Sequence, residues 1–501
     1  MNENFKVLLI YPNTMMATLV PLNVSMLSAA LKKNGFKVAL FDTTFYKTEK
    51  INFEQKKVEL LQVKRFNLEE AGLGFKKTDI YSDLGLMIKE FSPDLIGITL
   101  VEDTFNLGLS LLKSIKKFGI PVVAGGVFVN FFADEIIKED SIDMICLGEG
   151  EETIVELCRA MAGGVDYRNI QNIWFKDENG KVNKNSLRGL VDLDVLPYID
   201  FDIFEEKRMV RPMQGKLFKM LHVEAQRGCP YGCTYCEAPA IRKLYEKDNK
   251  GAGYFRIKSP RRLIDELNFL VKKYKPDYIN MNAESFLAVN TDYLKNLSQM
   301  YKKEIGLPFW CQSRPETITE EKIKILKEMN CTDLQFGIEH GNETFRAEVL
   351  NRHCSNNQML KGLKIVEKYK IPYTVNNIIG FPGETRELIF DTINFNRQLS
   401  PKSINCYMFT PYRGTYLRKY CIDRGLLDKD ASTMQLLDGA DYKYDTIAKE
   451  ELYGLQRTFS LYARFPESEF KQIRIAEKFD EAGNNAFEQL KHLYYERFFN
   501  K

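Results

Sequence analysis

Short apolar runs alternate with helical stretches over the first third of the chain. The runs occupy Val7–Tyr11, Val38–Phe41, Leu95–Thr99, Pro121–Ala124 and Asp143–Leu147. Continuous β-branched runs of this length are typical of parallel strands that are buried on both faces. Residues 22–34 have helical periodicity and stop at Gly35, and residues 106–118 repeat the pattern. We therefore predict a doubly wound α/β domain, Rossmann-like or flavodoxin-like, over residues 1–165.

The pattern breaks over residues 166–215 and then resumes. Asp177–Lys181 indicates a turn and Leu193–Asp200 is extended and interrupted by proline, so we predict a small hairpin and linker. Six further βα units follow over residues 216–425, with strands at Met220–Ala225, Tyr278–Met281, Pro308–Gln312, Asp333–Ile338, Tyr373–Ile379 and Ile404–Phe409. Residues 450–465 and 470–499 have helical periodicity with aromatic residues at core spacing, which predicts a helical capping segment over residues 426–501.

Composition limits the classes of protein. A chain of 501 residues exceeds the size of one hydrophobic core. The net charge of +3 gives no basic footprint, which disfavours a nucleic-acid substrate. The apolar run Val7–Ile10 is too short for a signal sequence, and no stretch of about 18 apolar residues could span a membrane. We expect a cytoplasmic protein whose 10 cysteines serve as thiols or ligands.

Three cysteines with short spacing are the strongest chemical signal. Cys229, Cys233 and Cys236 supply three thiolates, one fewer than a closed metal site needs. An iron–sulfur cluster with three cysteine ligands leaves one iron open to another ligand. A zinc knuckle that borrows His222, or three unrelated core cysteines, are the alternatives.

The Cys-x3-Cys-x2-Cys run, with an aromatic residue before the last cysteine, resembles the radical S-adenosylmethionine (SAM) superfamily. The resemblance implies a partial (β/α)6 barrel, a [4Fe–4S] cluster on the three cysteines, and SAM bound at the open iron. Tyr235 would then pack near the adenine. Reductive cleavage of SAM would release a 5′-deoxyadenosyl radical, with electrons from a donor such as flavodoxin or ferredoxin.

Later strand ends carry further motifs of that family. Glu284 occupies the place of an acidic residue for the SAM amino group, although many relatives have Asp-Asp there. Gln312 and Arg314 are polar groups able to reach the ribose and carboxylate. Glu339, in a Gly-Ile-Glu-x-Gly segment, would contact SAM, and Ile378 begins the apolar-Gly-Phe-Pro-Gly-Glu turn beside adenine. As alternatives, Glu339 is a salt-bridge partner and the glycine turn closes a loop.

The first domain resembles the cobalamin-binding domain that precedes many radical SAM domains. The corrin would lie at the carboxyl ends of the strands, which carry Asn13, Thr14, Thr99, Gly125, Gly126, Gly148 and Glu149. The first histidine of the chain is His222, so the corrin is held without a protein imidazole, or the domain is an empty scaffold. If cobalamin binds, its tail would lie beside Thr99, Gly125 and Gly126, and Gly126→Val is expected to block cobalamin binding.

The resemblance implies a B12-dependent radical SAM enzyme acting on a small molecule. The first interpretation is methyl transfer to an unactivated carbon, or less often phosphorus, of a metabolite, natural-product or lipid precursor. The second is a radical cyclisation or rearrangement without net methylation, and the third is a non-catalytic cobalamin- or SAM-responsive binding protein. Residues 51–77 are polar, which indicates a solvated insertion more than a lid or partner surface.

Overall fold

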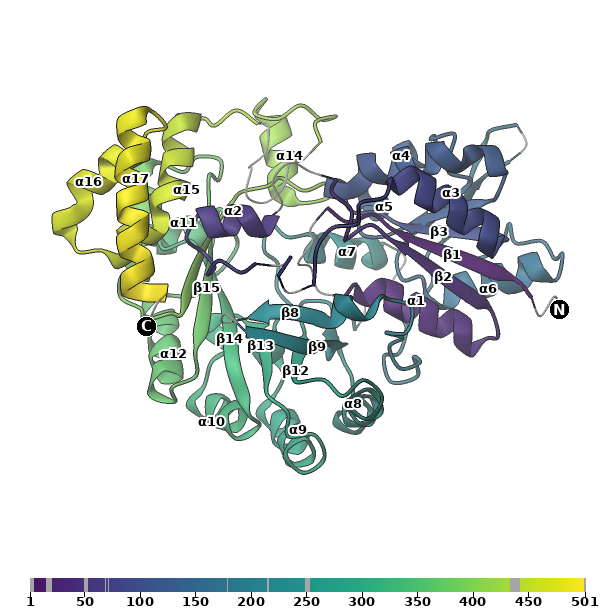
Figure 1. Ribbon diagram of the computed structural model, residues 1–501, viewed down its shortest axis with the longest axis horizontal. Helices are drawn as coiled ribbons and strands as arrows, with labels where there is room; N and C mark the ends of the chain where they lie inside the picture. The colour runs from purple at the N-terminus through teal and green to yellow at the C-terminus, as the bar shows by residue number, and fades with distance from the viewer. Residues whose placement is uncertain are drawn as a thin grey trace. The chain divides into compact units, whose positions relative to one another are not determined.

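The computed structural model describes residues 4–14, 20–48, 53–67, 69–70, 72–177, 179–213, 216–247, 253–432 and 442–499. The chain forms two compact units, whose elements Figure 1 shows. Unit 1 comprises Met1–Asn52, Asn67–Arg211 and Ala240–Ser259. Unit 2 comprises Phe53–Phe66, Pro212–Pro239 and Pro260–Lys501.

Unit 1 contains a sheet with the strand order β2-β1-β3-β4-β5-β6-β7. Its strands are β1 Lys6–Tyr11, β2 Lys37–Asp42, β3 Leu95–Thr99, β4 Val122–Gly125, β5 Met144–Cys146, β6 Ile173–Lys176 and β7 Val182–Lys184. The first five run parallel, and β6 and β7 are added antiparallel. The order 2-1-3-4-5 is the flavodoxin-like one, which confirms the predicted α/β fold.

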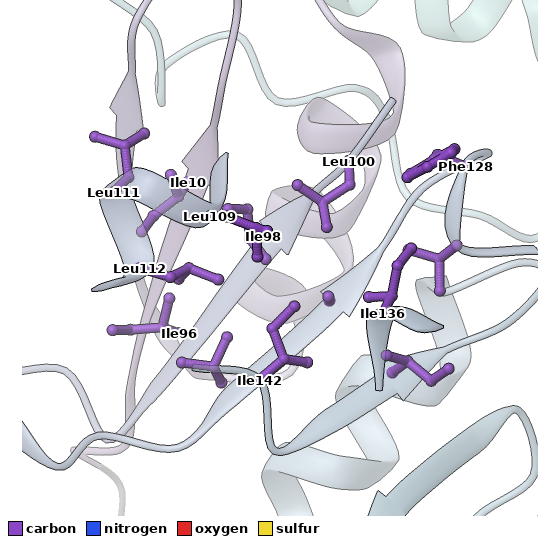
Figure 2. Packing of buried hydrophobic residues seen from close by; sticks show 14 of the residues in the cluster. Ile10, Ile96, Ile98, Leu100, Leu109, Leu111, Leu112, Phe128, Ile136 and Ile142 are labelled. Atoms are coloured by element: carbon purple, nitrogen blue, oxygen red, sulfur yellow. The ribbon is translucent and has the colours of Figure 1, made fainter. Parts of the chain in front are cut away.

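Helices cover both faces of this sheet. They are α1 Leu22–Lys33, α3 Ile80–Phe91, α4 Phe105–Ile115, α5 Val129–Ile136 and α6 Glu151–Ala162. Helices α1 and α6 lie on one face and α3, α4 and α5 on the other (Figure 1). Figure 2 shows the core between β3, β4 and the latter helices, where Ile98 and Leu112 are at most 2% exposed.

The hairpin predicted between residues 166 and 215 is β6–β7, and it extends the first sheet. The linker that follows packs on the same unit: Asp200 forms an ion pair with Lys32 at 2.7 Å, and Arg208 one with Asp42 at 2.8 Å. Arg208 is 5% exposed, so this second pair is buried.

Unit 2 contains a curled sheet with the order β16-β15-β14-β13-β12-β9-β8. Its strands are β8 Val210–Met213, β9 Lys216–Glu224, β12 Tyr278–Asn282, β13 Phe309–Ser313, β14 Cys331–Glu339, β15 Tyr373–Ile379 and β16 Ser403–Met408. The six strands from β9 to β16 pair in parallel. Helices α8, α9, α10 and α12 follow its outer side (Figure 1). The predicted half-barrel is confirmed.

The helices of unit 2 begin where the strands have just ended. They are α8 Pro260–Tyr274, α9 Thr291–Glu304, α10 Glu320–Glu328, α11 Glu343–Glu348, α12 Asn356–Lys368, α13 Arg386–Asn396 and α14 Tyr416–Asp423. Helix α7, Glu237–Glu246, begins in unit 2, and its residues from Ala240 onward belong to unit 1. Side chains of Asn290, Thr319, Asn342, Ser355, Thr385 and Thr415 accept a backbone N–H and cap α9 to α14. Local capping therefore fixes the residue at which each of these loops ends and its helix begins.

The polar insertion after β2 is exposed or half-exposed over most of its described residues, as its composition indicated, but one part of it is buried. It contains α2 Phe53–Glu59, and Leu61 and Gln62 are 0% and 1% exposed. The Gln62 side chain donates from Nε2 to the Cys406 carbonyl at 2.8 Å, and the Ser403 hydroxyl donates to the Gln62 carbonyl. The segment thus covers β16, the edge strand of the sheet, which would otherwise expose unpaired backbone groups.

The C-terminal helices are α15 Lys449–Arg464, α16 Phe470–Ala476 and α17 Glu481–Tyr494. Their aromatic residues are core, as predicted: Phe459, Tyr462 and Tyr494 are at most 2% exposed. Helix α15 packs against α13 and β16, and Arg386 of α13 pairs with Glu477 at 2.6 Å.

Candidate active site

The cysteine loop is held by its backbone and by side chains other than the thiols. The backbone N–H of Gly228 donates to Glu284 Oε1 at 3.1 Å. The Thr234 hydroxyl donates to the Val349 carbonyl at 2.6 Å, and the Thr234 N–H donates to the Leu350 carbonyl at 3.2 Å. The fold therefore positions the loop without using the sulfur atoms.

The three thiols are half-buried and form no disulfide. One contact is an N–H of Arg314, 3.5 Å from Cys233 Sγ. Burial raises the pKa of the Cys236 thiol to about 12, so a metal must displace its proton to bind. Among the described residues, no three His, Cys, Asp or Glu side chains converge on a single ion. A four-iron cluster ligates each cysteine through a different iron, so three separated thiolates fit it.

A row of alternating charges lies beside this loop. Arg314 donates to Glu316 Oε1 from Nε at 2.6 Å. Arg352, which is 1% exposed, lies 3.6 Å from Glu316 and 3.0 Å from Glu339 Oε1. The row therefore runs from Cys233 to Glu339. The sequence interpretation missed Glu316 and Arg352; Arg352 lies in a loop between α11 and α12 and carries no local motif.

Glu339 has an unusual backbone conformation. Its φ is +66°, and the β14–β15 register shifts between Gly337 and Glu339. A Cβ on Gly337 would lie 2.1 Å from Glu339 Oε1, so glycine is required for the carboxylate to fold back. Burial raises the pKa of Glu339, while the Arg352 guanidinium opposes the rise. Strain of this kind is characteristic of ligand-binding positions.

The predicted adenine neighbours share one apolar cluster. Tyr235 and Ile378 are half-buried against a core that includes Phe381 and Phe409. The ring centroids of Tyr235 and Phe381 are 6.0 Å apart. The tertiary structure thus brings Tyr235 and Ile378 to the same apolar surface.

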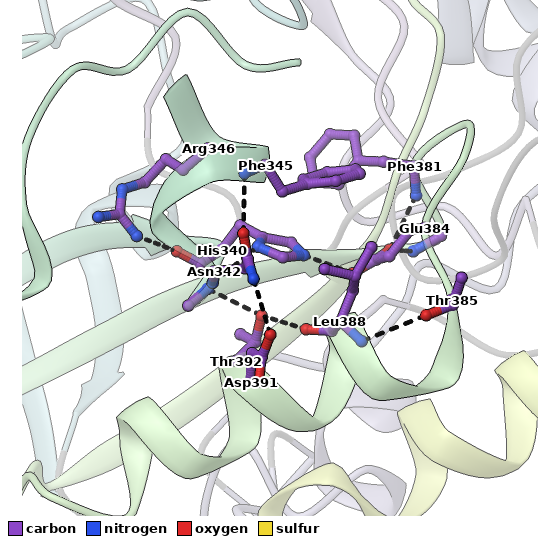
Figure 3. Close-up of polar contacts among 12 residues, drawn as sticks. His340, Asn342, Phe345, Arg346, Phe381, Glu384, Thr385, Leu388, Asp391 and Thr392 are labelled. Carbon is purple, nitrogen blue, oxygen red and sulfur yellow. Dashed lines mark hydrogen bonds and ion pairs between the residues drawn. The ribbon is translucent and has the colours of Figure 1, made fainter. Parts of the chain in front are cut away.

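His340 and Glu384 form a buried pair behind that surface (Figure 3). The backbone N–H of Asn342 donates to His340 Nδ1 at 3.0 Å, so the ring proton is on Nε2 and is donated to Glu384 Oε1, also at 3.0 Å. The other Glu384 oxygen accepts the N–H groups of Gly380 and Phe381. His340 is 0% exposed, so it is a satisfied structural residue that fixes the turn after β15.

Two other predicted site residues, Gln312 and Glu284, form hydrogen bonds near the ends of the strands of unit 2. Gln312 donates from Nε2 to the Ala283 carbonyl at 3.0 Å. Glu284 is exposed, and its contact with Gly228 places it beside the start of the cysteine loop.

Two glycines, Gly125 and Gly126, lie at the end of β4 in unit 1, and the space around a Cβ differs between them. Gly126 has φ +109°, and a Cβ there would lie 2.4 Å from the Leu100 carbonyl oxygen. A Cβ on Gly125 would be 3.8 Å from its nearest neighbour, the Cys146 carbonyl oxygen, which is ordinary contact. Gly126→Val would therefore disturb the sheet and is not the selective probe that we expected. Among the described residues nothing requires glycine at position 125, and the bare backbone there suits a large ligand.

Glu149 and Gly148 contact residues of α7 and of the segment that follows it. Glu149 forms an ion pair with Arg256 and accepts the Val191 N–H at 2.8 Å. A Cβ on Gly148 would lie 2.4 Å from Tyr245 Oη, which accepts the Glu149 N–H at 2.9 Å. Tyr245 and Arg256 both belong to unit 1, and no local pattern predicted their partners.

The remaining predicted corrin residues also lie at strand ends. Asn13 donates to the hydroxyls of Thr43 and Thr44 at 2.6 and 2.8 Å, which ties the end of β1 to that of β2. Thr14 follows it. The Thr99 hydroxyl accepts from Asn23 Nδ2 at 3.3 Å. The two methionines after Thr14 lie outside the described residues.

Known protein families match both units. The Radical SAM superfamily model matches residues 223–395, and the B12 binding domain model matches residues 66–158. An uncharacterized methyltransferase of Pyrococcus horikoshii is 30% identical over 352 residues, which cover 69% of this chain and 73% of the relative. The chain belongs to the B12-binding branch of the radical SAM superfamily. It is a cobalamin-dependent radical SAM enzyme, with a [4Fe–4S] cluster, SAM and cobalamin as cofactors.

Other relatives are more distant. The cytidylyl-2-hydroxyethylphosphonate methyltransferase of Streptomyces wedmorensis is 21% identical over 89% of this chain and 85% of its own length. The anaerobic magnesium-protoporphyrin IX monomethyl ester cyclase of Rubrivivax gelatinosus is 23% identical over 75% of this chain and 66% of its own length.

Two solved structures share the fold. The radical SAM methyltransferase TsrM of Kitasatospora setae has a TM-score of 0.64 at 18% identity, over 84% of this chain and 75% of that one. The cobalamin-dependent radical SAM enzyme OxsB has a TM-score of 0.68 at 15% identity, over 99% and 72%. Within the described residues, every helix is too short or too polar to cross a membrane.

Proposed function

We propose that the protein transfers a methyl group to an unactivated carbon, or less often phosphorus, of a small metabolite, natural-product or lipid precursor. One observation carries the proposal: the same chain contains both a loop with three free cysteines and a B12-binding sheet. At the end of a strand in that sheet, no described residue requires Gly125 to be glycine. Two relatives that bear the name methyltransferase support it.

In this proposal unit 2 binds the cluster and SAM. When bound, these groups supply the radical that activates the substrate, and cobalamin supplies the methyl group. Cys229, Cys233 and Cys236 hold the cluster. Glu339, oriented by Arg352, receives the SAM ammonium through a charge-assisted hydrogen bond.

Side chains around these positions orient the rest of SAM. Tyr235 and Ile378 pack beside the adenine, and Gln312 and Arg314 face the ribose and carboxylate. Glu284 binds the amino group or, through Gly228, steadies the loop.

Unit 1 holds the corrin at its strand ends. Gly125 lets the macrocycle or its tail approach the backbone of β4, with Asn13, Thr14, Thr99 and Gly126 around it. Gly148 and Glu149 shape the neighbouring loop, which Arg256 and Tyr245 fix. An electron donor such as flavodoxin or ferredoxin reduces the cluster.

The test needs no substrate. Anaerobic holoenzyme is reduced with flavodoxin or dithionite and given SAM labelled with deuterium in its methyl group. Methyl transfer predicts S-adenosylhomocysteine in an amount that matches bound cobalt, and none in enzyme prepared without cobalamin. If 5′-deoxyadenosine forms without S-adenosylhomocysteine, methyl transfer is wrong.

The second candidate is a radical cyclisation or rearrangement without net methylation. The likeness to the Rubrivivax gelatinosus cyclase over 75% of this chain favours it. The same assay separates the two, because only methyl transfer consumes the methyl group of SAM.

A further inference from the structure

The two faces of the curled sheet in unit 2 differ in polarity. On the outer face, which the helices cover, Cys311, Phe336 and Val375 are 0% exposed. Neighbouring positions point to the inner face, because side chains alternate along a strand. There Gln312, Gln335 and the residues paired with them are half-exposed. The inner face is therefore polar and accessible.

Six positions of this face on β14, β15 and β16 carry no formal charge. Paired residues of a parallel sheet point to the same side, and the register pairs Gln335 with Thr374, and Asn376 with Asn405. Ser403 and Tyr407 complete this set on β16. Lys, Arg, His, Asp and Glu are absent from these six positions.

Three carboxamides on this surface form one hydrogen-bonded group, which we call the amide triad: Gln335, Asn376 and Asn405. Asn376 Oδ1 accepts from Gln335 Nε2 at 3.0 Å and from Asn405 Nδ2 at 2.8 Å. Turning any one amide over would place two oxygens or two NH2 groups together. The network therefore fixes which end of each amide is free.

The free ends have unmet hydrogen-bonding capacity. Asn405 is 4% exposed, and within the described residues its Oδ1 has no hydrogen-bond partner. Gln62, 1% exposed and bonded to the carbonyl of the adjacent Cys406, likewise has an unpaired Oε1. Buried acceptors without donors are rare, because leaving a polar group unsatisfied costs about 1–3 kcal/mol. Both sites therefore call for a donor that the described residues do not supply.

We propose that the amide triad recognises an uncharged part of the substrate that carries a hydrogen-bond donor beside an acceptor, as a lactam or cyclic imide does. The donor reaches Asn405 Oδ1 and the acceptor meets Asn376 Nδ2. An anionic group is disfavoured here, because none of the six positions carries a cation that would balance it. The inference rests on the proposed function only in that the bound molecule is the substrate of the same barrel.

Ligand-observed NMR on the cluster-loaded, cobalamin-loaded enzyme tests the proposal. The probes are 2-pyrrolidinone and uracil, with acetate and methylphosphonate as anionic comparisons. The neutral probes should bind, and Asn405→Leu should weaken them at least ten-fold. Thr374→Val, on the same face of β15, is the matched control and should bind as the unchanged enzyme does.

A second variant guards against loss of fold. Asn405→Asp keeps the volume but replaces the NH2 that donates to Asn376 Oδ1 with a charged oxygen. Asn376 should then turn its own NH2 toward the carboxylate and no longer offer it to the lactam carbonyl. This variant should therefore lose the lactam and gain binding of acetamidinium, which misfolding would not produce. Absence of lactam binding, equal binding of the anions, or lactam binding that survives both Asn405 substitutions would overturn the proposal. Substrate-free S-adenosylhomocysteine formation should be unaffected, so failure of methyl transfer and failure of this inference are read separately.

Discussion

Gly125→Val tests whether the B12-binding sheet is built around a ligand. Gly125 ends β4, is half-buried and has no positive φ. Among the described residues, a Cβ added at this position would meet only Cys146, at 3.8 and 3.9 Å. Valine is favoured in strands, so the chain alone should accept the change, with a gain of up to about 1 kcal/mol.

The substitution is expected to weaken cobalamin binding. If the corrin or its tail lies against this backbone, two added methyl groups occupy its space. Overpacking of a filled site costs about 1–3 kcal/mol, which corresponds to cobalamin binding weakened about 5- to 150-fold.

Equilibrium dialysis of cobalamin, with cobalt and iron counted per chain and thermal unfolding followed in parallel, measures the effect. Gly85→Ala in α3, where nothing lies within 4 Å of the new Cβ, is the control and should leave cobalamin binding unchanged. Gly126→Ala should instead lower the unfolding temperature, because its Cβ meets the Leu100 carbonyl. Unchanged cobalamin affinity in Gly125→Val would refute the reasoning.

Four further predictions concern unit 2. Replacing any one of the cluster cysteines with alanine should abolish iron loading and SAM cleavage but spare cobalt; full SAM cleavage by the triple variant would contradict the assignment. Arg352→Met should destabilise unit 2 by about 3 kcal/mol in urea unfolding, because it leaves the Glu339 carboxylate buried without its cation, and adding Glu339→Gln should restore part of the loss. Glu339→Gln alone should weaken SAM binding about 10- to 100-fold with the cluster spectrum intact, as expected for a charge-assisted bond of about 1.5–3 kcal/mol; iron loss would point to another role. Glu384→Gln should cost about 1–3 kcal/mol, since one of its donors, His340 or the turn, then faces an NH2 group; an unchanged unfolding midpoint would count against the pair.

Local patterns in the sequence determined the strand series, the two α/β units and the cysteine loop. Buried parallel strands require continuous apolar runs, and helix starts require capping side chains, so both features are encoded within a few residues. The spacing of Cys229, Cys233 and Cys236 is likewise local. These features could be predicted because their physical causes act between near neighbours along the chain.

Contacts between distant segments were decided only by the tertiary structure. The partner of Glu149 is 107 residues away, and Gln62 bonds to a strand 344 residues away. The amide triad depends on register between three strands, and Glu339 on a shift in that register. Judged from the sequence alone, many residues could pair with a carboxylate such as Glu149 or donate a hydrogen bond to a carbonyl on an edge strand. Strand order, register and packing select among them, and these come from the whole core at once rather than from any one segment.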